Sequence, residues 1–198
     1  DTIEAMAEGA REAGLSYLAI TDHSRSLAMT GGLDERSLLA HARRIRAVGR
    51  RLDGITLLAG VECDILPDGR LDLAEDCLAE LDLVVASVHS AFNQDEDQMT
   101  ERILRAMESP VVDIVGHPTG RLLLRRAAYP VNIERLIDAA ARLGVMLEIS
   151  SQVDRLDLND VHARLARDRG VKLVINTDSH SSRGFGMLRW GVTVARRG

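Results

Sequence analysis

The sequence is poor in aromatic residues, which make up 3% of the chain, and it contains only two cysteines. A chain with so few aromatic side chains builds its core from Leu, Val, Ile and Ala. Because Cys63 and Cys77 lack a C-x-x-C spacing, they argue against a disulfide framework and indicate reduced thiols in an intracellular, cytoplasmic protein. No apolar run approaches the length of a transmembrane helix, and no secretory signal opens the chain.

What the chain does contain is enough apolar material for one globular domain: 45% of its 198 residues are hydrophobic and 28% are charged. The formal net charge of −5 is mild and argues against a non-specific nucleic-acid-binding surface over the whole molecule. A local basic groove remains compatible with this charge, because an acidic metal site adds to the negative count.

Short apolar runs alternate with amphipathic segments along the chain. We expect strands over Tyr17–Thr21, Thr56–Glu62, Leu83–Val88, Val111–Val115, Val145–Ile149, Lys172–Asn176 and Gly191–Ala195. We expect helices over Thr2–Ala13, Asp34–Leu52, Asp72–Ala79, Gln98–Met107, Asn132–Leu143, Leu158–Arg169 and Ser182–Trp190. Such alternation predicts an α/β fold with a buried parallel sheet, and we favour a barrel.

Two connections stand out in this pattern. Ser24–Gly32 is polar and rich in glycine, which predicts a loop where the first strand ends, and Asp68–Gly69 is a hairpin-turn signal.

Potential metal ligands stand at the carboxyl ends of several predicted strands, where a barrel assembles its active site. They are His23, Glu62, His89, His117, Asp178 and His180. Imidazole and carboxylate together suit Zn, Mn or Fe better than Mg or Ca. Six groups exceed the needs of one ion, so we expect two or three ions that share a bridging carboxylate. Clustered divalent ions activate water and stabilise displacement at phosphorus, which predicts phosphate-ester hydrolysis.

A single histidine at a strand end is more often a hydrogen-bonded structural residue than a ligand, and only the joint pattern indicates a metal site. His41 and His162 fall in the middle of predicted helices, and we interpret them as surface or packing residues.

The motifs at these strand ends resemble the PHP (polymerase and histidinol phosphatase) superfamily. They read, in chain order, T-D-H, G-V-E, S-V-H, G-H-P and T-D-S-H. Longer stretches, such as L-L-A-G-V-E-C-D-I-L-P-D-G-R-L-D-L, are similar to the C-terminal PHP domain of bacterial family X DNA polymerases. The resemblance spans nearly all of residues 1–198. It implies a distorted (β/α)7 barrel, a trinuclear site with manganese or zinc, and 3′→5′ exonuclease or related phosphoesterase action on DNA in repair.

The resemblance also implies roles for individual residues. Glu62 would bridge two ions, with His89 and His117 on one of them and Asp178 on the other, and the third ion would take His23 and His180. Glu62, His89 and Asp178 would take part in catalysis. Asp22 matches a family position as well, either as a weak ligand or as a group that orients a neighbouring histidine.

The chain departs from the family pattern in two places. The family opens with a strand that carries an H-x-H pair, which is absent here, so we expect a barrel without its first strand. We also expect a longer parent chain with polymerase domains upstream. The stretch Leu147–Leu156 differs from the usual Asn-rich sequence, which leaves substrate contact there in doubt.

Arginines in the predicted loops on the metal side are candidates for binding substrate phosphate, because guanidinium binds phosphate in a bidentate manner. We place Arg121 and Arg25 in this role ahead of Arg125 and Arg126. Two alternatives to a DNA exonuclease stay open at this point: a stand-alone phosphatase for a small monoester such as histidinol phosphate, and a structural module without activity.

Overall fold

Helices and strands alternate regularly in the computed structural model, which describes residues 1–27 and 31–198. Residues 28–30 belong to the loop predicted over Ser24–Gly32 and lie outside the described part of the chain. The elements in order are α1 (Ile3–Glu12), β1 (Tyr17–His23), α2 (Glu35–Gly49), β2 (Thr56–Asp64), α3 (Glu75–Leu78), β3 (Leu83–Ser87), α4 (Glu96–Met107), β4 (Ile114–Val115), α5 (Ile133–Leu143), β5 (Met146–Ser150), α6 (Asp160–Asp168), β6 (Leu173–Asn176), the 3-10 helix η2 (Gly184–Met187) and α7 (Leu188–Arg197).

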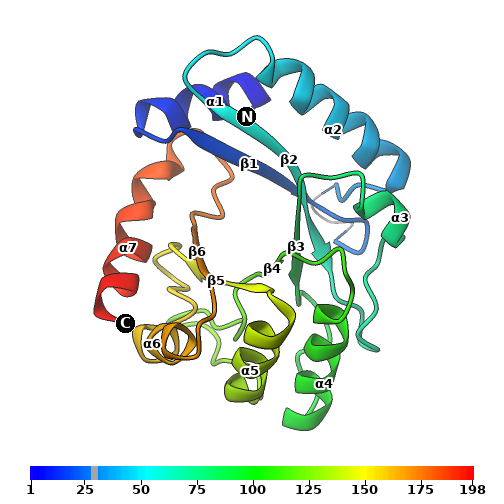
Figure 1. Ribbon diagram of the computed structural model, residues 1–198, viewed down its shortest axis with the longest axis vertical. Helices are drawn as coiled ribbons and strands as arrows, with labels where there is room; N and C mark the ends of the chain where they lie inside the picture. Colours follow the sequence, from blue (N-terminus) through cyan, green and yellow to red (C-terminus); the bar gives the residue numbers. More distant parts are fainter. Residues whose placement is uncertain (28–30) are drawn as a thin grey trace.

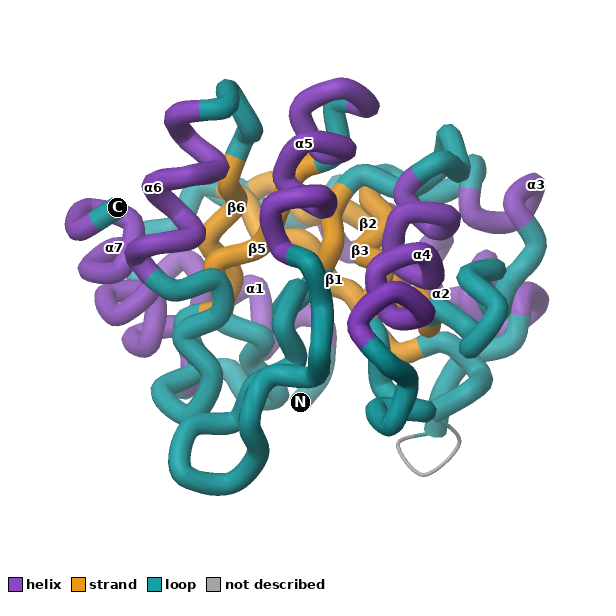
Figure 2. The backbone as a smooth tube through the Cα atoms, turned by 90° about the horizontal axis from the view of Figure 1, so that it is seen from below, coloured by secondary structure: helices purple, strands orange, loops and turns teal. Residues whose placement is uncertain are grey.

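The six strands form one parallel sheet whose neighbours follow the chain order from β1 to β6. The sheet curls into an open half-barrel with the helices around its outside (Figure 1). Seen from below, α4, α5 and α6 lie in front of the strands (Figure 2). β1 and β6 are the edge strands of this sheet. The predicted α/β fold with a parallel barrel-type sheet is therefore confirmed, and all carboxyl ends of the strands lie on one rim.

Local sequence signals explain where the helices begin and end. The side chains of Thr2, Asp34, Asp95 and Asn132 each accept a hydrogen bond from a main-chain N–H in the first turn of a helix. Such caps satisfy donors that have no partner within the helix. Gly144 ends α5 in the left-handed conformation, with φ of 77°, which glycine adopts without steric cost.

The core between the sheet and the outer helices is aliphatic, as the scarcity of aromatic residues predicted. Around β3, β4 and β5 it is filled by buried side chains, among them the fully buried Met99, Ile103, Leu136, Ile137 and Leu147. A second cluster packs α1 and α2 against β1 and β2. Cys63 and Cys77 are buried and free.

The strand predicted over Gly191–Ala195 is wrong, because this segment lies within α7. The β-branched run V-T-V favours a strand locally, but α7 packs against β5 and β6 and tertiary packing overrides that preference. Gly191 permits the close approach: a Cβ there would lie 2.2 Å from Ser151 Oγ and 2.5 Å from Ile175 Cγ2.

Other predicted elements exist but are shorter than expected. Only Glu75–Leu78 is α-helical in the segment predicted over Asp72–Ala79, and β4 is limited to Ile114–Val115. Asp68–Gly69 forms the predicted turn, closed by antiparallel pairing of Ile65 with Leu71. Within residues 1–27 and 31–198, none of the helices is long and apolar enough to cross a membrane.

Candidate metal centre

Glu62 is the centre of a cluster of three histidines at the carboxyl rim of the sheet. Its Oε1 lies 3.0 Å from His117 Nε2 and 3.3 Å from His89 Nε2, and its Oε2 lies 3.4 Å from His23 Nδ1. The four side chains come from the ends of β1, β2, β3 and β4. Strand register explains the meeting, because His23 stands opposite Glu62 in the β1–β2 pair. The two carboxylate oxygens thus face different imidazoles, which is the arrangement that a bridging ligand requires.

The charges of this cluster are strongly coupled. Burial would raise the pKa of Glu62, but its contacts with His117 and His89 outweigh burial and hold the pKa well below its usual range. Burial would likewise lower the pKa of His89, but the carboxylates of Asp64 and Glu62 raise it to about 9. Glu62 is therefore a carboxylate at neutral pH and carries the negative charge that a cation needs.

The donor set fits a divalent metal ion. One ligand atom from each of His23, Glu62 and His89 can be chosen so that all three lie within 4.8 Å of one another. His23 Nδ1 is buried without a hydrogen-bond partner, although a carboxylate oxygen is close by. A buried imidazole nitrogen in this situation can be satisfied by a bound cation.

Asp64 is a part of the centre that the sequence pattern did not predict. It lies two residues after Glu62 on β2, so its side chain points to the same face of the sheet. Its Oδ1 accepts a hydrogen bond from His89 Nδ1 at 2.8 Å. This contact turns His89 Nε2 toward Glu62 and selects the tautomer that can bind a metal. The alternation of acids in G-V-E-C-D was the signal that could have identified it.

Asp178 and His180 follow β6 and lie on the open side of the cluster. Burial and the charge of Glu62 raise the pKa of Asp178, so the two carboxylates are electrostatic neighbours. The ring of His180 lies 6.1 Å from that of His23, and its side chain is 73% exposed. The structure thus places both predicted residues at the same rim, but outside the direct contacts of Glu62.

His117 and Asp178 share an unusual backbone conformation, with φ of 26° and 47°. Non-glycine residues with positive φ are strained, and such strain concentrates at functional sites.

The predicted arginines make contacts within the protein itself. Arg25 pairs with Glu35 at 3.3 Å, and Arg121 donates hydrogen bonds to the main-chain carbonyls of Arg155 and Leu156. Arg155 itself was missed by sequence reasoning, because it lies in the stretch that departs from the family pattern. Its Nε lies 3.8 Å from Asp178 Oδ2, and its Nη1 is buried without a hydrogen-bond partner.

Asp22 lies next to His23 in the chain but points away from the cluster. Its Oδ2 lies 2.8 Å from Nε2 of His41 on α2. Successive side chains of a strand face opposite sides, so Asp22 pairs outside the sheet while His23 faces Glu62. His41 is thus a helix-packing residue with a defined partner.

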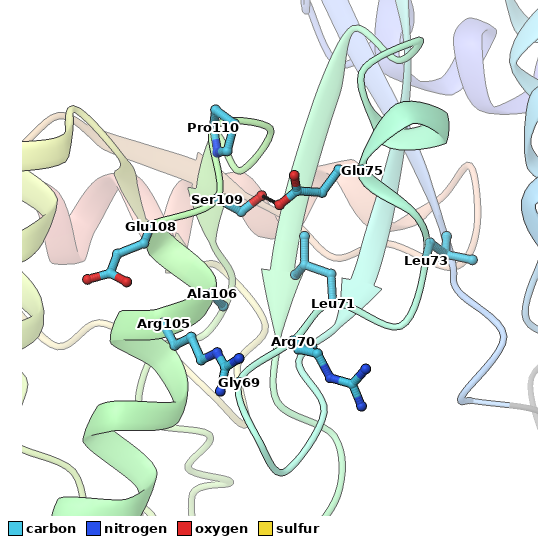
Figure 3. A pocket seen from close by; sticks show the side chains of 10 residues that line it. All are labelled: Gly69, Arg70, Leu71, Leu73, Glu75, Arg105, Ala106, Glu108, Ser109 and Pro110. Carbon is cyan, nitrogen blue, oxygen red and sulfur yellow. Dashed lines mark hydrogen bonds between the residues drawn. The ribbon is translucent and has the colours of Figure 1, made fainter.

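An open groove of about 440 Å³ lies elsewhere, between the Asp68–Gly69 turn and the end of α4 (Figure 3). Among the residues that line it are Arg70 and Arg105, but no histidine is present in this lining. Its Glu75 accepts a hydrogen bond from Ser109 at 2.5 Å. The groove therefore lacks the donor set of the cluster around Glu62, which remains the candidate site.

The family model of the PHP domain matches residues 1–152 of this chain. The chain belongs to the PHP domain family. The DNA polymerase/3′-5′ exonuclease PolX of Bacillus subtilis is 44% identical over 197 residues, which cover all of this chain and 35% of that protein. A probable phosphatase of Caldanaerobacter subterraneus is 32% identical over 186 residues, covering 87% of this chain and 68% of the relative. The chain thus spans about a third of the polymerase relative and two thirds of the phosphatase.

A solved structure shares the fold of this PHP domain. Histidinol phosphate phosphatase from Lactococcus lactis, complexed with zinc, L-histidinol and phosphate, superposes with a TM-score of 0.65 at 14% identity. The match covers all of this chain and 87% of that one. The predicted family and the PHP-type barrel fold are therefore confirmed, and the family supports a phosphoesterase activity.

Metal binding by this PHP domain should weaken as the pH falls. The pKa of about 9 means that His89 carries a proton in the metal-free protein at pH 7, and this proton must leave before Nε2 can bind an ion. We expect the Mn²⁺ affinity to rise between pH 6 and 9 by up to about tenfold per pH unit and then to level off. Isothermal titration calorimetry in buffers of different ionisation enthalpy measures both affinity and proton release. An affinity that does not change over this range would contradict the expectation.

Proposed function

We propose that this PHP domain hydrolyses phosphodiester bonds of DNA with bound divalent ions, as the 3′→5′ exonuclease of a family X DNA polymerase in DNA repair. The observation that carries the proposal is the buried carboxylate of Glu62, faced by imidazoles from three neighbouring strands. The 44% identity to PolX over all of this chain supports DNA as the substrate. Polymerase domains in the same parent chain, in the cytoplasm, would deliver the 3′ end.

The proposed ligands divide between two or three ions of manganese or zinc. Glu62 would bridge two of them, with His89 and His117 on the first and Asp178 on the second. His23 and His180 would hold the third. When bound, such ions activate a water molecule and neutralise charge on the phosphoryl oxygens.

Arginine side chains supply the proposed contact to the phosphate. Arg155 is the best placed, because its Nε lies 3.8 Å from Asp178 Oδ2 and its side chain keeps 17% of its surface exposed at this rim. Guanidinium is suited to phosphate. The predicted substrate residues Arg121 and Arg25 would contact DNA farther from the reacting phosphate.

A second candidate function is hydrolysis of small phosphate monoesters. Probable phosphatases of Caldanaerobacter and Thermoanaerobacter, 32% and 31% identical to this chain, favour it, since the chain covers 68% and 78% of their lengths.

The two functions differ in the products that they release. The purified chain is incubated with Mn²⁺ and a single-stranded oligonucleotide labelled at its 5′ end, and in parallel with p-nitrophenyl phosphate and histidinol phosphate. We expect a ladder of fragments shortened from the 3′ end, which disappears with a chelator or with a phosphorothioate at the terminal linkage. Release of phosphate from the monoesters with an intact oligonucleotide would favour the phosphatase instead. Absence of both reactions in a metal-loaded chain would indicate a structural module.

A further inference from the structure

Glu148 is a buried carboxylate in the middle of β5. It is 4% exposed, and its side chain accepts two hydrogen bonds. Oε2 accepts from the main-chain N–H of His117 at 2.6 Å, and Oε1 accepts from the side-chain amide of Asn176 at 2.8 Å. The donors belong to the segments that follow β4 and end β6, which carry His117 and Asp178.

The contact with His117 replaces a bond of the parallel sheet. Val115 pairs with Leu147, so a continuing ladder would join the N–H of His117 to the carbonyl of Glu148. That carbonyl accepts from the N–H of Leu158 at 3.0 Å instead. The side chain of Glu148 therefore takes over the acceptor role at the point where the chain leaves the sheet.

This point is where His117 adopts its positive φ of 26°, with only 2% exposure. A buried N–H without an acceptor is costly, so the strained turn needs the carboxylate to persist. The preceding residue, Gly116, has no room for a side chain, because a Cβ there would lie 2.3 Å from Ser87 Oγ. From this backbone conformation the imidazole of His117 reaches Glu62, with 3.0 Å between Nε2 and Oε1.

We infer that Glu148 is a positioning residue of the metal centre, which holds the backbone of His117 and the end of β6 in the geometry that the ligands require. This inference rests on the proposed metal-dependent function. An apolar side chain would fill the same space without the cost of burying a carboxylate. Only an acceptor of two hydrogen bonds can tie both segments, and each of its two oxygens holds one of them.

The variants E148M and E148Q separate positioning from packing. Methionine keeps the volume of the side chain but removes both acceptors. Glutamine keeps one acceptor for His117, and Asn176 can reverse its amide to accept from the new N–H₂ group. D113N is the matched control, because Asp113 accepts from the main-chain N–H of Val84 at 2.8 Å at the opposite end of the sheet.

Three measurements are made on each variant and the wild type: amide hydrogen exchange of a peptide containing His117 in the metal-free protein, Mn²⁺ affinity by calorimetry, and kcat and KM for bis-p-nitrophenyl phosphate. For E148M we expect faster exchange at His117, Mn²⁺ affinity lower by about 10- to 100-fold, and a lower kcat. For E148Q we expect changes in the same direction, with Mn²⁺ affinity lower by about three- to tenfold, because a neutral acceptor is weaker than a carboxylate. D113N should leave all three at wild-type values.

Wild-type exchange and Mn²⁺ affinity in folded E148M would overturn the inference, as would equal losses in E148M and D113N. If E148M does not fold, the comparison of E148Q with D113N tests the inference instead. Identical exchange, Mn²⁺ affinity and kinetic values in these two variants would overturn the inference. If the wild type neither binds Mn²⁺ nor cleaves the diester, the proposed function fails. The exchange at His117 still shows in that case whether Glu148 holds this turn, and unchanged exchange in E148M would reject the inference separately.

Discussion

Replacing Glu62 with glutamine should reduce the metal-dependent hydrolysis of phosphodiesters on the order of a thousandfold or more. The amide has the shape of the carboxylate but no charge, and its N–H₂ group would face imidazole nitrogens that now point at oxygen. Ions bridged by Glu62 would lose their common ligand, and the repulsion between them would no longer be balanced. The measurement is kcat/KM on the labelled oligonucleotide, together with the metal content of the purified protein by elemental analysis.

E75Q is the control for this experiment. Glu75 is an exposed carboxylate in the groove of Figure 3 and accepts a hydrogen bond from Ser109. Loss of its charge should leave metal content and activity unchanged. Full manganese-dependent activity in E62Q would remove the basis of the proposed function.

The largest loss of stability is expected for R102M. Arg102 lies on α4 with 2% exposure and donates hydrogen bonds to the main-chain carbonyls of Ile65 and Ser90. Ile65 follows Asp64, and Ser90 follows His89. One guanidinium therefore joins the two segments that carry the hydrogen-bonded pair Asp64 and His89. Methionine would leave the two carbonyls without their donor, which lowers the free energy of unfolding by about 2–5 kcal/mol. Urea unfolding followed by circular dichroism measures the change.

Arg105, one turn farther along α4, is the matched control for Arg102. It is exposed, lines the groove of Figure 3, and donates a hydrogen bond of 3.2 Å to the carbonyl of Asp68. R105M should change the free energy of unfolding by less than about 0.5 kcal/mol. Mn²⁺ affinity should fall in R102M and stay constant in R105M, because only Arg102 supports the segments of Asp64 and His89. Equal stability of the two variants would contradict the proposed support.

The comparison of prediction with structure shows which sequence signals are reliable here. Strand ends such as G-V-E and S-V-H could be identified from the chain alone, because an apolar run that stops at a polar residue indicates where a buried strand leaves the core. The segment Gly191–Ala195 is helical although its run V-T-V favours a strand, because three β-branched residues carry no information about the element that they pack against. Its helical state goes with the packing of α7 against β5 and β6.

The groups that support the site were harder to predict than the candidate ligands. Asp64, Glu148 and Arg155 are single polar residues without a motif of their own, and their roles come from partners at least 23 positions away in the chain. Arg121 has partners of the same kind. It donates hydrogen bonds to the carbonyls of Arg155 and Leu156, contacts that no local sequence signal predicts.

The order of residues by itself determined the alternation of helices and strands, the parallel sheet, and the set of imidazoles and carboxylates at the strand ends. These features depend on hydrophobic periodicity and chain connectivity, which are local properties. The curl of the sheet decided the rest. It placed His23, His89 and His117 around one carboxylate, and the packing of α2 brought His41 to Asp22. Distances between side chains on different strands follow from register and twist, which no stretch of sequence contains alone.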